Sequence, residues 1–134
     1  MKTCFYILAL MLLTLSCNSD DDNHQTNIPT LDGEWSLVNV FGGLAGVDDD
    51  FDVGTIIWDF DEDNSELTVT NTNTANVVYD GFPSGTYDYE LLTTDGDTSI
   101  IINTFTYRIT SLTSSQLVID EGIALDGFLL TFSR

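Results

Sequence analysis

In the stretch TIIWDFD, residues 55–61, every second residue from Ile56 is bulky and apolar, and the residues between them are polar except for Ile57. Successive side chains of an extended strand point to opposite faces of a sheet, so Ile56, Trp58 and Phe60 share one face. The threonine and the two aspartates share the other face. A half-buried strand has this two-residue period, whereas an amphipathic helix repeats its apolar positions every three or four residues. The stretch therefore predicts a strand that turns bulky apolar groups toward a core and carboxylates toward solvent.

Seven further segments repeat this period from Leu31 to the end of the chain. They are short and rich in Thr, Val, Ile, Tyr and Phe, which is typical of strands. Asp95-Gly96, between two of them, is a hairpin turn signal. We therefore predict an all-β fold of about eight antiparallel strands without a helix. The residues that mark these segments are Trp35, Leu37 and Phe41; Leu67 and Val69; Tyr87, Tyr89 and Leu91; Ser99 to Ile102; Phe105, Tyr107 and Ile109; Leu117 and Ile119; and Phe128, Leu130 and Phe132.

Two closed arrangements suit residues 31–134, whose length is that of one domain. They are an up-and-down barrel and a sandwich of two sheets. The alternation favours a barrel with aromatic side chains inside and acids outside. A barrel of eight strands is just wide enough to be filled by its own side chains or to hold one small ligand.

Several short motifs resemble those of lipocalin-like domains, and together they span nearly all of residues 31–134. LDGEWSL (31–37) is similar to the Gly-x-Trp opening strand of that family, and WDF (58–60) with LTV (67–69) to its second hairpin. YRI (107–109) with Leu112, LVI (117–119) and the ending FSR (132–134) complete the pattern. The resemblance implies a small eight-stranded up-and-down barrel, in which Trp35 plugs one end and Arg134 packs over it.

The first residues have the form of a signal peptide. Lys2 gives a basic start, and the apolar run 4–15 is too short to span a membrane but long enough for a signal-peptide core. Ser16-Cys17 at its end resembles the lipobox of bacterial lipoproteins. That resemblance implies removal of the leader 1–16, acylation of Cys17 and anchoring in the outer membrane. The alternative is a secreted protein with Cys17 as a free thiol. Because Cys4 would leave with the leader, no lasting disulfide is expected.

Residues 17–30 have no apolar period and should form a lipidated acidic tether. Ser19, Asp20, Asp21 and Asp22 resemble the surface-export signal of Bacteroidota-type lipoproteins. The resemblance implies display of the domain on the cell surface. The alternative is a solvated spacer that keeps the domain away from the membrane.

The charge balance restricts the possible partners. The chain has 22 acidic and 3 basic residues and a net charge of -19. Nucleic-acid binding depends on Lys and Arg contacts to phosphate, so this composition excludes it. Contact with anionic lipid head groups is also disfavoured, which leaves the lipid on Cys17 as the expected link to the membrane. Plausible partners are neutral, cationic or bridged by divalent ions.

Two groups of side chains are candidate sites. Asp48, Asp50 and Asp52 lie in an expected long loop between the first two strands, where carboxylates could bind Ca²⁺ or be an acidic loop in solvent. An aromatic stripe on the expected inner face could stack on a sugar, cover an apolar ligand, or simply form the core. Its hydroxyls would need partners, for which Asn39 and Asn103 are available. The stripe consists of Trp35, Trp58, Tyr87, Tyr89, Phe105 and Tyr107.

The residue types argue against an enzyme. The expected domain has no Cys, Lys or His, because His24 lies in the tether. A Ser-His or Cys-His nucleophile is therefore not available, and no Gly-rich phosphate loop appears. The carboxylates in the strands alternate with the apolar residues, so they should lie on the opposite face, in solvent. Raised pKa values are not expected there. We expect neither catalysis nor a cofactor.

Two functional interpretations remain. The first is a surface lipoprotein whose lipocalin-like barrel binds a small apolar or sugar-like ligand, inside or at its mouth. The second is a structural or interaction lipoprotein with a filled barrel that presents acidic loops to another envelope protein. The volume of the interior separates the two: a cavity of about 300 Å³ or more favours a ligand, and a packed interior favours a partner protein.

Overall fold

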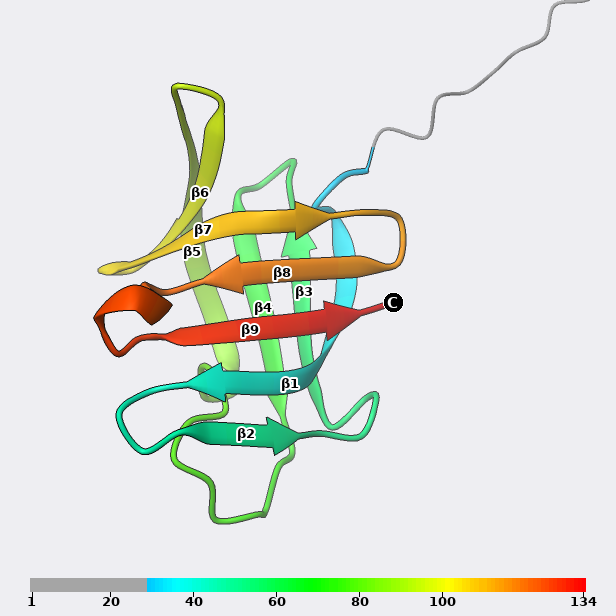
Figure 1. Cartoon of the computed structure of the whole chain (residues 1–134). Helices are drawn as coiled ribbons and strands as arrows, with labels where there is room; N and C mark the ends of the chain where they lie inside the picture. The colour runs from blue at the N-terminus through cyan, green and yellow to red at the C-terminus, as the bar shows by residue number, and fades with distance from the viewer. Residues whose placement is uncertain (1–28) are drawn as a thin grey trace, which may run out of the picture.

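Nine antiparallel strands and one 3₁₀ helix make up residues 29–134, the part of the chain that the computed structural model describes (Figure 1). No helix within these residues has the length and apolarity needed to cross a bilayer. The elements are β1 (Gly33–Gly42), β2 (Val47–Asp50), β3 (Ile56–Asp61), β4 (Glu66–Asn71), β5 (Gly85–Thr94), β6 (Asp97–Ile102), β7 (Phe105–Leu112), β8 (Gln116–Asp120), η1 (Ile123–Leu125) and β9 (Phe128–Ser133).

Eight of the strands form a closed up-and-down barrel. Each strand from β3 to β9 pairs with its neighbour in sequence, and β1 closes the ring by pairing with β3 on one edge and β9 on the other. In Figure 1, β7, β8 and β9 cross in front of β3 and β4, with the core between them. The barrel predicted from the alternation is confirmed, and the sandwich is excluded. Closure removes the sheet edges that a sandwich would leave exposed.

The ninth strand, β2, corrects the expectation of a long loop. Val47–Asp50 pairs with Asn39–Gly42 of β1, beyond the point where β3 leaves that edge. Its sequence is one valine followed by three aspartates, of which only Val47 is buried. It is a strand because its backbone pairs with β1, and its sequence has no alternation of apolar side chains that would have predicted a strand.

A β-bulge in β1 changes which residues face the core. Leu37 pairs with Phe132 and Asn39 with Thr131, so Val38 is an extra residue without a partner on β9. An extra residue reverses the inward and outward alternation beyond it. Val40 is consequently fully buried, whereas Phe41 is 48% exposed. The expectation that Phe41 faces the interior is therefore wrong.

This bulge predicts an unusual order of mutational effects. Val40→Ala should lower the free energy of unfolding by about 2 kcal/mol, because it opens a void in a packed interior. Phe41→Ala removes a larger side chain but should cost less than about 1 kcal/mol, since half of that ring is already in solvent. Urea denaturation of the two variants checks the order. A larger loss for Phe41→Ala would mean that β1 has no bulge.

The hairpin of β5 and β6 extends beyond the barrel. Its turn residues Asp95 and Gly96 both have positive φ, at 53° and 92°, as the two-residue turn requires, and the predicted hairpin is confirmed. In Figure 1 the hairpin rises past β7, which runs off in another direction. Leu91 is 44% exposed because this part of β5 has left the barrel, which corrects its expected place in the core.

Candidate functional site

Trp58 lies at the centre of the interior and is fully buried. Its ring centroid is 5.0 Å from that of Phe132, 5.4 Å from Phe82, 6.1 Å from Phe60 and 6.2 Å from Tyr107. Rings at these separations are in contact. The barrel around Trp58 is thus packed with the protein's own aromatic side chains and is not shaped as a cup.

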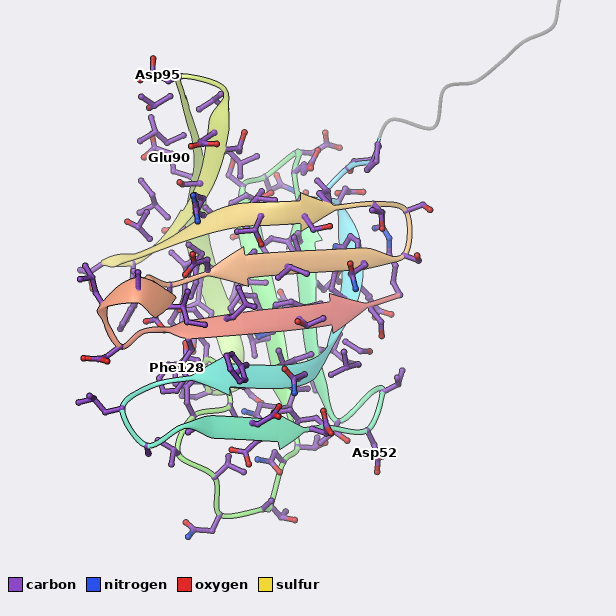
Figure 2. All side chains as sticks on the ribbon, viewed as in Figure 1. Asp52, Glu90, Asp95 and Phe128 are labelled. Carbon is purple, nitrogen blue, oxygen red and sulfur yellow. The ribbon has the colours of Figure 1, made fainter. Side chains whose placement is uncertain are left out.

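Residues 72–84, which connect β4 to β5, close one end of the barrel. Figure 1 shows this connection crossing the end opposite the β5–β6 hairpin. Phe82 is buried against Trp58, and the hydroxyl groups of Tyr79 and Tyr107 lie 3.1 Å apart. Tyr79 also stacks on Phe128, labelled in Figure 2, at 4.5 Å between centroids. Residues 72–84 therefore fill this end of the barrel.

Gly81 allows this close fit. Its φ is +84°, and a Cβ atom added to it would lie 3.2 Å from Cζ2 of the Trp58 ring. Both the backbone conformation and the space favour glycine. The Nε1–H of Trp58 points to this region and has no hydrogen-bond partner among the described residues.

The other predicted lining residues lie nearer to the ends. Tyr87 is partly buried and donates its hydroxyl hydrogen to the carbonyl oxygen of Pro83, while Phe105 is 44% exposed beside Phe82. Tyr89 is buried against Phe60, and its hydroxyl has no partner within residues 29–134. The expected role of Asn39 and Asn103 as partners of these hydroxyls is therefore wrong.

Burial raises the pKa values of three tyrosine hydroxyl groups, those of Tyr79, Tyr89 and Tyr107. Burial raises the pKa of Tyr79 to about 12, although its hydrogen bond to Tyr107 acts in the opposite direction. The pKa of Tyr107 is raised further, chiefly by burial and then by Tyr79. Burial, followed by the negative charge of Glu62, raises the pKa of Tyr89 to about 12. All three groups are neutral in the folded protein at physiological pH.

These shifts predict alkaline unfolding. A tyrosine ionises near pH 10 in an unfolded chain, whereas these buried tyrosines remain neutral up to about pH 12. The free energy of unfolding is therefore unaffected by these groups below about pH 10 and decreases as the pH rises toward 12. An absorbance titration of tyrosinate should therefore show a late component that coincides with loss of near-ultraviolet circular dichroism. Tyr79→Phe should reduce the amplitude of that component. Ionisation of every tyrosine near pH 10 with the fold intact would contradict the buried arrangement.

Trp35 and Arg134 meet at the opposite end of the barrel. The guanidinium carbon of Arg134 lies 4.0 Å from the ring centroid of Trp35, within range of a cation–π interaction. Arg134 also donates hydrogen bonds to the carbonyl oxygens of Asp32, Thr30 and Ser114. The Trp35 Nε1–H donates to the carbonyl oxygen of Leu31 at 2.7 Å. The ring, the guanidinium and the chain entering β1 together seal this end.

The acidic residues of β2 surround an amide group. The Nδ2 of Asn39 donates to Asp48 at 2.9 Å and to Asp50 at 3.0 Å. Asp52 does not join them, and within the described residues no three His, Cys, Asp or Glu side chains are placed to hold a metal ion. Figure 2 shows Asp52 far from Glu90 and Asp95 of the hairpin. The amide of Asn39 thus bridges two of the three carboxylates that were candidates for calcium.

Glu62 has a role that the sequence did not suggest. It lies in the β3–β4 turn, and its Oε1 accepts hydrogen bonds from the backbone N–H groups of Leu31 and Asp32. The N–H of Glu62 donates in turn to Asp32. These reciprocal hydrogen bonds hold the residues just before β1 against the β3–β4 turn, about thirty residues later in the sequence.

An open groove of about 490 Å³ lies above this end of the barrel, between the β5–β6 hairpin and β7. Its apolar lining includes Leu31, Leu91, Ile109 and Leu112, and its acidic lining is Glu62 and Asp97. Ile109 and Leu112 both face it because a bulge at Thr110 resets the alternation of β7. Sequence reasoning missed the groove, which exists only because two neighbouring strands diverge.

The predicted lipidation and export residues, Cys17, Ser19 and Asp20 to Asp22, lie outside the residues that the structure describes.

Comparison with solved structures identifies the class of fold as a lipocalin-like barrel. A lipocalin-like protein from Bacteroides uniformis ATCC 8492 superimposes with a TM-score of 0.51 at 14% identity, covering 78% of this chain and 97% of that one. An uncharacterized protein from Bacteroides eggerthii DSM 20697 gives a TM-score of 0.51 at 12% identity, with 78% and 99% covered. No protein-family model matches the sequence, and no curated protein is similar to it.

Proposed function

We propose that this protein is a non-enzymatic interaction module, held in the outer membrane by lipid on Cys17 and displayed at the cell surface. It recognises its partner with the exterior of a filled lipocalin-like barrel. The observation that carries this proposal is the burial of Trp58 beneath four aromatic rings. A barrel that binds a ligand inside needs empty volume next to such a ring.

The sequence supports the location and the absence of catalysis. The lipobox-like Ser16-Cys17 and the acidic residues that follow fit a surface lipoprotein. Residues 29–134 contain no Cys, Lys or His, so neither a Ser-His nor a Cys-His pair can form in that part of the chain. An interaction surface needs neither pair.

A small apolar or sugar-like ligand is the second candidate. The buried Nε1–H of Trp58, which has no partner within the described chain, is the observation that favours it. A ligand bearing an acceptor atom would satisfy this donor, provided that residues 72–84 moved aside. This function requires displacement of Phe82 and Tyr79, both of which are packed against other rings.

Native mass spectrometry of the protein purified from its original host in detergent distinguishes the two candidates. For an interaction module we expect the mass of the acylated chain without a further small molecule. A stoichiometric compound that leaves only when the barrel unfolds would overturn the proposal in favour of a ligand carrier. A Phe82→Ala variant provides the control, because opening this end should change the occupancy only if a ligand resides inside.

A further inference from the structure

The β5–β6 hairpin forks away from both of its neighbours. β4 pairs with β5 only as far as Asp88, and β7 pairs with β6 only as far as Ser99. β5 and β6 nevertheless remain paired to the turn at Thr94 and Asp97. Figure 2 shows Glu90 along this hairpin and Asp95 at its projecting tip. The fork leaves a cleft between the hairpin and the following strand.

This cleft is bordered by open strand edges. From Ile109 to Leu112, β7 pairs with β8 on one side, and no other strand of residues 29–134 lies along its second edge. The same is true of the edge of Asp97 and Thr98 on β6. Backbone groups along an open edge are a template for a strand from another chain.

The groove of about 490 Å³ occupies the cleft, and its lining combines two kinds of group. Leu91, Ile109 and Leu112 offer apolar contacts, while Glu62 and Asp97 place carboxylates at the border. A strand that alternates apolar and charged side chains would match such a surface on its two faces. The lining contains no basic residue.

The charge of the described chain indicates the sign of the occupant. Its two arginines are already engaged: Arg108 pairs with Asp120 at 3.1 Å, and Arg134 binds backbone carbonyl groups over Trp35. Neither Glu62 nor Asp97 has an arginine partner within residues 29–134, and Glu62 is bonded only to neutral donors such as the N–H groups of Leu31 and Asp32. A second copy of this acidic chain would bring like charges together, whereas a basic segment would be attracted.

We infer that this groove binds an extended, basic segment of a partner protein, which adds as a strand along the open edge of β7. The inference rests on the proposed function and assigns its interaction surface. Apolar residues of the segment contact Leu91, Ile109 and Leu112, and its Lys or Arg residues face Glu62 and Asp97. Strand pairing supplies affinity, and the carboxylates select for charge.

A labelled peptide of alternating lysine and valine tests the inference by fluorescence anisotropy with the purified protein. Leu91→Lys and Leu92→Lys form a matched pair, since the two residues are adjacent and 44% and 48% exposed but only Leu91 lines the groove. We expect Leu91→Lys to weaken binding at least about tenfold and Leu92→Lys to change it less than about threefold. Asp97→Asn and Asp95→Asn repeat the comparison without adding a cation, should Leu91→Lys fail to fold.

Two further probes define the outcome. A peptide with alternate backbone nitrogens methylated keeps its charge but cannot pair as a strand, and it should not bind. The inference is overturned if the methylated peptide or spermidine binds as tightly as the unmodified peptide, or if the two lysine variants bind that peptide equally well. Any of these results would reduce the interaction to general attraction by an acidic surface. Dimerisation that Leu91→Lys abolishes would assign the groove to a second copy and also overturn it. None of these results depends on the barrel interior, so a ligand found there would refute the proposed function separately.

Discussion

Replacing Trp58 by alanine is expected to lower the free energy of unfolding by about 3–5 kcal/mol, which approaches the whole stability of a small domain. The indole contacts Phe60, Phe82, Tyr107 and Phe132, and its removal leaves all four rings facing a void. No disulfide joins the described strands, because residues 29–134 contain no cysteine. Chemical denaturation followed by far-ultraviolet circular dichroism measures the loss.

Trp58→Phe is the matched control, since it keeps an aromatic ring at the same position and should cost clearly less than alanine. The size of the alanine effect also separates the two functional candidates. A side chain that lined an empty cup would leave little new void when truncated, and its loss would reduce ligand binding more than stability. A loss of less than about 1 kcal/mol for Trp58→Ala would therefore contradict a filled barrel.

The success of the sequence prediction around Trp58 has a simple physical reason. Ile56, Trp58 and Phe60 occupy every second position of an uninterrupted strand, with aspartates after Trp58 and Phe60, so the two-residue period alone determines their face. The same reasoning placed Trp35 and Tyr107 in the interior, and both are fully buried. Local periodicity is sufficient where the strand has no bulge and stays within the barrel, whereas Leu91 is exposed because β5 has left it.

The errors occur where the partner strand, and not the local sequence, decides the geometry. The extra residue Val38 is defined by its register against β9, and nothing in the sequence around it marks a bulge. The strand β2 exists because β1 has a free edge beyond β3, although its aspartates suggest a loop. Both features require knowledge of pairings between residues distant in sequence.

The candidate surfaces were harder to predict for a related reason. Tyr79 meets Tyr107 across 28 positions, and the loop that carries it is polar enough to suggest solvent. The groove arises from the divergence of β6 and β7, whose residues individually look like ordinary strand residues. Residue types indicated that the exterior was acidic, but only the arrangement of strands shows where apolar and acidic groups meet.

Replacing Cys17 by alanine is expected to transfer the protein completely from the membrane fraction to the soluble fraction. The acidic chain has little affinity of its own for anionic lipid, and its link to the bilayer would be the acyl chains on Cys17. Each buried methylene group contributes about 0.8 kcal/mol, so two or more chains make release slow, and the loss of all of them leaves no comparable attraction. Fractionation of cells, with immunoblotting of the pellet after a salt and carbonate wash, measures the effect.

Cys4→Ala is the matched control, because it changes the other cysteine of the chain but lies within the expected leader and leaves the proposed lipid site intact. It should pellet like the natural protein. Continued pelleting of Cys17→Ala would show that something other than this thiol holds the chain, and the interaction module would need a different link to the membrane.

Replacement of Asp20, Asp21 and Asp22 by asparagine tests display at the cell surface alone. This variant should still pellet with the membrane, but its domain should be protected from protease added to intact cells. If the variant stays anchored and the protease still reaches the domain, Asp20 to Asp22 are not needed for display at the cell surface. Of the proposed roles of this segment, only lipidation of Cys17 would then be supported.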